Sequence, residues 1–205
     1  ADLTGPPMTD KLTLLIHHPY RPPAGFEAVP PAVHKASTVI FPDVKALRAR
    51  RWDSKDGYTY GLHGTPTTFV LEERIAELEG GTHCVLAPSG LAAITLVNLA
   101  LLKVGDEVLL PANVYGPSKA QARELLAGLG VTHRLYDPMD PPALAAMVGP
   151  RTRLVWVEAP GSVTMEFPDL SALVAAAKAG GAVCALDNTW GAGVAFEPFE
   201  MGVDL

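Results

Sequence analysis

Short apolar runs alternate with longer stretches of helical periodicity from Pro66 to the end of the chain. The five runs lie at His83–Ala87, Glu107–Pro111, Val131–Tyr136, Leu154–Val157 and Ala182–Leu186. The stretches between them are rich in alanine and leucine and lie at Leu91–Lys103, Ser118–Ala127, Pro141–Val148 and Leu170–Ala179. Short runs that alternate with helices are typical of parallel strands joined by right-handed crossovers. The pattern therefore predicts an α/β fold, a three-layer sandwich with a mainly parallel sheet.

One further helix is predicted before the first of these runs. Thr67 and Thr68 are possible N-caps for it, and Gly80 and Gly81 should end it. Its apolar residues recur at helical spacing and would share one face: Leu71, Ile75 and Leu78.

Residues 1–65 have a different character, because proline is concentrated near the start of the chain. Eight prolines fall at positions 6, 7, 19, 22, 23, 30, 31 and 42. Proline fixes φ and removes a backbone donor, so this stretch cannot form regular sheet or helix. We predict an extended N-terminal arm with one short helix around Asp43–Arg51. An arm with so little core must lie against its own body or against a neighbouring subunit.

Composition and charge narrow the function classes. The chain has 205 residues, 48% of them hydrophobic, and a net charge of -6 with no basic stripe, which argues against nucleic-acid binding. The longest apolar stretch, Leu91–Leu102, is too short to span a bilayer, and the N-terminus lacks the order of a secretory signal. Cys84 and Cys184 sit in apolar runs typical of buried, inert thiols. We expect a cytoplasmic, disulfide-free protein with neither membrane nor nucleic-acid partners.

Candidate site residues follow the predicted strands, because ligands of an open parallel sheet bind beyond the carboxyl ends of its strands. Ser89 and Gly90 open a long helix, where free N–H groups could bind a phosphate, although Ser89 could instead merely cap the helix. Tyr115 could stack on a planar ligand or fill the edge of the core. Asp187 could be the counter-ion of a protonated ring nitrogen or could cap the next turn.

Other catalytic signatures have little support. The six histidines show no metal-ligand spacing, so no metal site is expected. The sequence contains no GxGxxG, Walker or GxSxG motif. Glu166 and Asp169 remain open as an acid–base pair, but a solvated helix start is the simpler interpretation.

Four ordered motifs resemble the Cys/Met-metabolism family of pyridoxal-phosphate (PLP) enzymes, the cystathionine and methionine lyases and synthases. They are YGLHGTPTTFVLEERIAELEGGTHCVLAPSGLAA, VLLPANVYGPS, VEAPGSVTMEFPDL and ALDNTWGAG, and together they cover about residues 55–205. The resemblance implies a PLP-binding large domain over residues 66–205, truncated here, without the family's C-terminal domain. It also implies a homodimer or homotetramer that shares the phosphate site between subunits.

The resemblance also implies roles for individual residues. Gly90 and Leu91 would present backbone N–H groups to the cofactor phosphate in a turn begun by Ser89. Tyr115 would stack on the pyridine ring and adjust proton transfers. Asp187 would pair with the pyridinium nitrogen, which would let the ring act as an electron sink. The remaining two residues with implied roles are Thr189, which would support the other side of the ring, and Tyr60, which would reach the phosphate of the partner subunit.

The chain departs from the family pattern in two places. Leu62 stands where many members have an arginine that bonds the phosphate. Ser162, in Glu-Ala-Pro-Gly-Ser, stands where many γ-acting members have asparagine. Pro-Gly-Ser followed by Thr164, Met165 and Glu166 resembles the bacterial cystathionine β-lyases most.

The family's Schiff-base lysine would lie soon after the segment that matches Met201–Leu205, and none of the seven lysines of the chain occupies that place. We therefore expect the chain alone to be inactive. The complete protein is expected to be a carbon–sulfur lyase that cleaves L-cystathionine, an amino-acid substrate, by α,β-elimination to homocysteine, pyruvate and ammonia. The alternatives are γ-elimination or γ-replacement, and a non-catalytic binding or assembly module.

Overall fold

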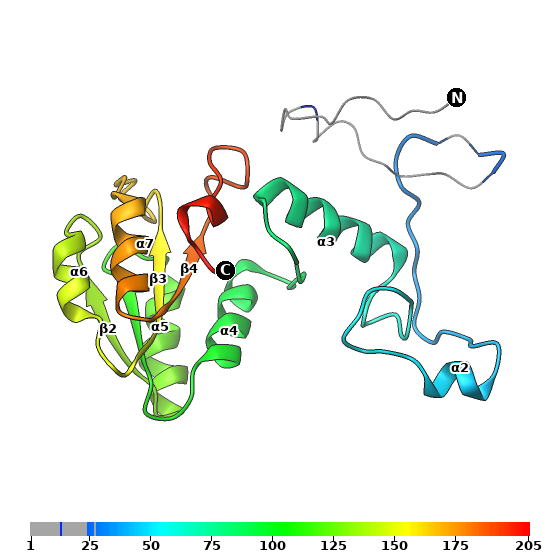
Figure 1. Ribbon diagram of the computed structural model, residues 1–205, viewed down its shortest axis with the longest axis horizontal. Helices are drawn as coiled ribbons and strands as arrows, with labels where there is room; N and C mark the ends of the chain where they lie inside the picture. Colours follow the sequence, from blue (N-terminus) through cyan, green and yellow to red (C-terminus); the bar gives the residue numbers. More distant parts are fainter. Residues whose placement is uncertain (1–12, 14–23, 27) are drawn as a thin grey trace. The chain divides into compact units, whose positions relative to one another are not determined.

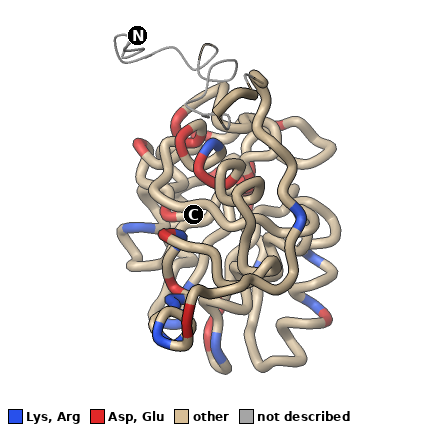
Figure 2. The backbone as a smooth tube through the Cα atoms, turned by 90° about the vertical axis from the view of Figure 1, so that its right-hand side faces the viewer, with Lys and Arg blue, Asp and Glu red and all other residues tan. Residues whose placement is uncertain are grey.

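The computed structural model describes Thr13, residues 24–26 and residues 28–205. The chain divides into two compact units, and the boundary along the sequence falls between Leu86 and Ala87. Part of the predicted arm, with the prolines at 6, 7, 19, 22 and 23, lies outside the described residues. Figure 2 shows that basic and acidic residues are interspersed along the described chain. No helix of the described part is long and apolar enough to cross a membrane.

A parallel four-stranded sheet forms the centre of the second unit (Figure 1). Its strands are β1 (Glu107–Pro111), β2 (Thr132–Tyr136), β3 (Thr152–Glu158) and β4 (Val183–Asp187). The strands lie in the order β2-β1-β3-β4, and each neighbouring pair is parallel. The predicted α/β class with a parallel sheet is confirmed.

Helices cover both faces of this sheet and so complete three layers. They are α4 (Gly90–Leu101), α5 (Gly116–Gln121) with the π-helical turn η1 (Ala122–Leu126), α6 (Pro141–Met147) and α7 (Leu170–Ala179). The neighbours Val108 and Leu109 of β1 are fully buried in different clusters, because successive side chains of a strand point to opposite faces. Val108 packs in the cluster that contains Ile94 of α4, and Leu109 packs in the cluster that contains Leu173 of α7.

The last residues of the chain lie along the outer edge of β4, after the short helix η2 (Phe199–Met201). Leu186 N donates to Leu205 O at 2.9 Å, and Leu205 N donates to Cys184 O at 3.3 Å. This alternation is the hydrogen-bond pattern of a parallel pair. Asp204 accepts a bond from Cys184 N at 2.9 Å and from Lys178 Nζ at 2.5 Å.

In its described part, the first unit contains the helices α2 (Val44–Arg48) and α3 (Pro66–Glu79). Asp43 caps α2 through a 2.7 Å bond from Ala46 N, so the predicted short helix of the arm is present. The predicted N-cap of α3 was wrong. Thr65 is the cap, and its side chain and that of Thr68 bond each other's backbone N–H groups. Gly80 ends α3 at φ 75°, which favours glycine.

The prediction of a strand at 83–87 was also wrong. Strands need backbone partners, but here side chains of the first unit occupy the backbone groups of this run. Glu72 of α3 accepts from Leu86 N at 3.0 Å, and Lys55 Nζ donates to Cys84 O at 2.6 Å. Lys55 also donates to the buried Glu72, and this ion pair joins both contacts. The run is therefore held as an irregular segment.

Candidate active site

The carboxyl ends of three neighbouring strands carry the main candidate residues of the second unit. Tyr115 follows β1, Glu158 ends β3 and Asp187 ends β4. Glu158 and Asp187 are direct partners in the parallel register of β3 and β4. Since both strands end here, the two carboxyl groups lie side by side at one edge of the sheet.

Asp187 is half-buried and begins the turn after β4. Its Oδ1 accepts hydrogen bonds from Thr189 N at 3.1 Å and from Thr189 Oγ1 at 2.5 Å. The turn-capping contact weighed from the sequence is therefore present. A carboxylate has two oxygens and several acceptor positions. The turn consequently leaves the carboxylate able to accept a bond from a ligand as well.

Tyr115 lies in the loop between β1 and α5 with 41% of its surface exposed. A ring that filled the edge of the core would be buried, so its exposure favours contact with a ligand. Its backbone N–H donates to Glu158 Oε2 at 2.9 Å. The residue is thus anchored by its main chain and presents its side chain outward.

Glu158 is the functional candidate that sequence reasoning missed. It is only 4% exposed, and burial raises its pKa to about 7. The negative charge of Asp187 raises the pKa further, while the bond from Tyr115 N and the charge of Lys119 lower it. The available signal was a glutamate that ends an otherwise buried apolar strand, since such a residue needs a specific partner.

Glu158 should make stability depend on pH. Below about pH 4.5 the carboxyl is protonated in both states, and between about pH 4.5 and 7 only the folded protein keeps the proton. The free energy of unfolding should therefore fall as pH rises through this window, by at most about 3 kcal/mol, and then stay level. Glu158→Gln should abolish this component in urea unfolding at a series of pH values. An unchanged pH profile in that variant would contradict the assignment.

The start of α4 is the candidate phosphate-binding turn. Ser89 accepts a bond from Ala92 N at 3.1 Å and thereby caps the helix, as one sequence interpretation proposed. A side chain on Gly90 would meet nothing within 4 Å, so the space in front of the first turn is open. The first N–H groups of a helix have no partner within the helix. The N–H groups of Gly90 and Leu91 are thus suited to an anion.

A chain of buried polar groups fixes α4 against the sheet. Trp156 Nε1 on β3 donates to Asn98 Oδ1 at 2.9 Å, and Asn98 Nδ2 donates to Gln121 Oε1 at 2.8 Å. Gln121 Nε2 then donates to Thr95 Oγ1, which donates to Leu91 O at 2.6 Å. The chain runs from the middle of the sheet to the first turn of α4, so it couples the candidate phosphate-binding turn to β3.

Asn113 connects the loops that follow β1 and β3. Its Nδ2 donates to Glu166 Oε2 at 2.8 Å and to Thr164 Oγ1 at 3.2 Å. A side chain on Gly161 would lie 2.0 Å from this amide nitrogen, so glycine allows the close approach. Glu166 is therefore used to hold a loop. Asp169 instead caps α7 through Ala172 N at 3.0 Å, so the two acids have separate partners.

Tyr60, the remaining candidate, belongs to the first unit. Tyr60 forms an isolated antiparallel β-bridge with Thr38, and Gly61 N donates to Ser37 O at 2.7 Å. Tyr60 is exposed, and Ser37 Oγ donates to its hydroxyl at 3.3 Å. Leu62, where the family pattern has arginine, is 90% exposed. The backbone pairing holds Tyr60 at the surface of its unit, with its side chain open to contact.

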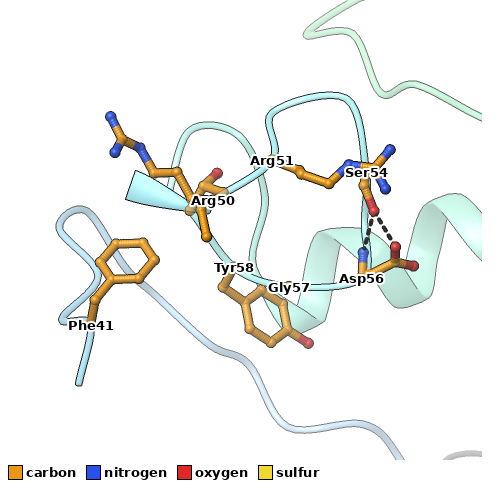
Figure 3. A pocket seen from close by; sticks show the side chains of 9 residues that line it. Phe41, Arg50, Arg51, Ser54, Asp56, Gly57 and Tyr58 are labelled. Carbon is orange, nitrogen blue, oxygen red and sulfur yellow. Dashed lines mark hydrogen bonds between the residues drawn. The ribbon is translucent and has the colours of Figure 1, made fainter. Parts of the chain in front are cut away.

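Two hollows occur in the first unit, and neither is lined by a predicted cofactor residue. One of about 240 Å³ lies among Phe41, Arg50 and Tyr58, beside the bonded pair Ser54 and Asp56 (Figure 3). Arg50 donates to Leu47 O and Arg51 pairs with Asp53, so both guanidinium groups already have partners. The other, of about 850 Å³, is lined by residues of α3 and of the loops before and after it, with acidic, basic and apolar side chains. The described residues contain no cluster of His, Cys, Asp or Glu that could hold a metal.

The residues of the second unit fit pyridoxal phosphate by their chemistry. The open first turn of α4 offers N–H groups to a phosphate, the carboxylate of Asp187 suits a protonated ring nitrogen, and the exposed ring of Tyr115 suits a planar ring. All three lie in loops after strands or at a helix start, on the side of the sheet where ligands of such folds bind.

Comparison with known proteins identifies the class. Residues 12–205 match the family described as Cys/Met metabolism PLP-dependent enzyme. The chain therefore belongs to this family. A putative cystathionine β-lyase of Rhizobium johnstonii is 43% identical over 176 residues, which are 86% of this chain and 43% of that protein. Cystathionine β-lyase of Escherichia coli is 39% identical over 181 residues, 87% of this chain and 46% of that protein.

Relatives with other names also match. L-methionine γ-lyase of Pseudomonas putida is 35% identical over 193 residues, 94% of this chain and 48% of that protein. A solved structure of a putative O-acetylhomoserine (thiol)-lyase from Campylobacter jejuni, with N′-pyridoxyl-lysine-5′-monophosphate, has a TM-score of 0.86 at 25% identity. That match covers 95% of this chain and 48% of the other. The chain thus spans about half the length of the relatives it matches.

Proposed function

We propose that the whole protein is a PLP-dependent carbon–sulfur lyase that converts L-cystathionine to homocysteine, pyruvate and ammonia by α,β-elimination. The observation that carries the proposal is the position of Asp187 at the end of β4, in register with Glu158, which bonds the main chain of the exposed Tyr115. The cystathionine β-lyases among the relatives, 34% to 43% identical to this chain, support this reaction over others. This chain would supply much of the cofactor-binding domain, and the remainder of the protein would supply the lysine.

Each proposed role rests on the chemistry of one residue. Gly90 and Leu91 bind the phosphate through backbone N–H groups in the turn capped by Ser89. Asp187 would accept a hydrogen bond from the protonated ring nitrogen and so keep the proton on the ring, while Thr189 fixes the carboxylate and would support the ring. Tyr115 covers the ring, and its hydroxyl can hold or pass a proton near the substrate. When bound, the cofactor supplies an electron sink for the carbanion next to the substrate carboxylate.

Product analysis tests the reaction. The whole protein, incubated with PLP and L-cystathionine, should release pyruvate, which chromatography of the 2-oxo acids separates from 2-oxobutyrate. Release of 2-oxobutyrate in place of pyruvate would overturn β-elimination, because that product comes from cleavage on the other side of the sulfur. A variant with Asp187→Ala serves as the negative control, since its loss removes the partner of the ring nitrogen.

γ-Elimination or γ-replacement is the second candidate reaction. It is favoured by the match to the methionine γ-lyase, which covers 94% of the chain. Ser162, in place of the asparagine of many γ-acting members, favours β-elimination instead. The residue is half-buried in the loop that Asn113 and Glu166 hold together. The same product assay decides between the two reactions.

Tyr60 is proposed to bind the phosphate of a partner subunit in a homodimer or homotetramer. Tyr60→Phe removes the hydroxyl, and we expect PLP affinity to fall by about tenfold, equivalent to the loss of one hydrogen bond to a charged group. Equilibrium dialysis of PLP measures this change, with Tyr58→Phe as the matched control in the same unit.

Mixed dimers test whether the contact is made across subunits. Subunits with Tyr60→Phe are combined with subunits carrying Asp187→Ala. If the contact is in trans, one of the two sites in the mixed dimer carries both defects and the other is intact. If both sites are defective, Tyr60 acts within its own subunit.

A further inference from the structure

We propose that Glu158 is a positioning residue, which holds the main chain of Tyr115 so that the exposed ring stays over the cofactor site. The bond from Tyr115 N to Glu158 Oε2, at 2.9 Å, is the observation that leads to this inference. The inference rests on the proposed cofactor site and is independent of the proposed substrate.

The loop that carries Tyr115 needs such an anchor. Tyr115 is the N-cap of α5, with φ -41° and ψ 120°, and its side chain makes no capping bond. The following Gly116 adds backbone freedom to the turn, and Pro117 has no N–H group with which to bond it. An exposed ring on an unanchored loop would sample many positions.

Apart from the backbone bond of α5 from Ser118 N to Tyr115 O, at 2.9 Å, the other anchors of the loop hold different residues. Lys119 Nζ donates to Ala112 O at 2.9 Å, and Asn113 is held by Glu166. Val114 N donates to Pro111 O at 3.0 Å. Among the side-chain hydrogen bonds of the described residues, the bond that Glu158 accepts is the one that holds Tyr115 itself. Glu158 is buried on β3, so the anchor belongs to the rigid sheet.

The charges around Glu158 suit this role. Asp187 on β4 faces it in register, Lys119 of α5 is the nearby cation, and Tyr115 supplies the N–H donor. Two adjacent carboxyl groups do not readily carry full charge together. A protonated Glu158 still accepts the bond from Tyr115 through an oxygen and leaves the negative charge to Asp187. Its raised pKa, to about 7, agrees with this division of roles.

A double-mutant cycle on the whole protein tests the inference without substrate. Glu158→Leu should weaken PLP binding by about tenfold and reduce the visible circular dichroism of bound PLP. In a Tyr115→Ala background, Glu158→Leu should weaken PLP binding by less than twofold, because the residue that Glu158 positions no longer carries a ring. Glu158→Gln keeps an acceptor oxygen and should bind PLP within about twofold of the wild type at pH 7.

Glu107→Gln is the matched control. Glu107 is a buried glutamate at the opposite end of the same sheet, where Arg134 bonds both of its oxygens at 2.6 and 2.8 Å. Any effect of this change should be the same in the wild-type and Tyr115→Ala backgrounds. Should Glu158→Leu fail to fold, Glu158→Ser replaces it, since serine is too short to reach Tyr115 N.

Three results would overturn the inference. They are an equal effect of the Glu158 change in both backgrounds, an unchanged PLP affinity and dichroism in the folded variant, or failure of the wild type to bind PLP. The last would overturn the proposed function too. Binding of PLP without release of pyruvate from cystathionine would overturn only the proposed reaction, and the cycle would still decide the role of Glu158.

Discussion

Asp187→Asn in the whole protein is expected to lower turnover by about 100-fold or more, within the range that positioned proton-holding groups contribute. The amide of asparagine carries no charge, so it cannot stabilise a proton on the ring nitrogen. The fold should survive, because asparagine can still accept the bonds from Thr189 that form the turn after β4. The decisive measurement is kcat for pyruvate release, together with a thermal melt.

The control for this change is Thr189→Val, which removes the hydroxyl bond to Asp187 and keeps the charge. We expect its loss of turnover to be well below that of Asp187→Asn. Near-normal kcat in the asparagine variant would rule out the assigned role, and a large drop in melting temperature would point to a structural role.

Asn98→Ala should destabilise the second unit by about 2 kcal/mol, because the buried Trp156 and the half-buried Gln121 both lose a hydrogen bond. Asn98 is 3% exposed and connects Trp156 Nε1 to Gln121 Oε1. Alanine leaves the buried Trp156 Nε1 without its partner. Urea unfolding monitored by far-ultraviolet circular dichroism measures the change.

Arg123→Ala provides the comparison for this prediction, since Arg123 is exposed. Arg123→Ala should change the free energy of unfolding by no more than about 0.5 kcal/mol. A cost for Asn98→Ala no larger than that of Arg123→Ala would show that the polar chain adds nothing to stability. Loss of PLP affinity alongside stability would further support the coupling of α4 to β3.

Periodicity predicted most of the second unit because its central strands, β1 and β3, are buried on both faces. Val108, Leu109 and Leu110 are nearly inaccessible, and only helices on both sides of a sheet produce such continuous apolar strands. The run 83–87 shows the same apolar character, yet it is not a strand. Its backbone groups are bonded by Glu72 and Lys55, and sequence periodicity carries no information on such distant side-chain contacts.

The candidate site was predictable to the extent that it follows the ends of strands. Asp187 and Tyr115 could be singled out because polar residues after apolar runs must lie at one edge of a parallel sheet. Glu158 could not be assigned a role in this way, because its partner is a backbone N–H that no sequence pattern reveals. The roles themselves came from the resemblance and remain proposals.

The position of Cys184 provides a reporter on the sheet. This thiol is fully buried on β4, and burial raises its pKa to about 12, whereas Cys84 is partly exposed in the first unit. Thiolate is the reactive form of cysteine, so a thiol reagent should label Cys184 only when the sheet opens. Labelling followed by mass spectrometry would therefore time the opening of the second unit separately from events at Cys84.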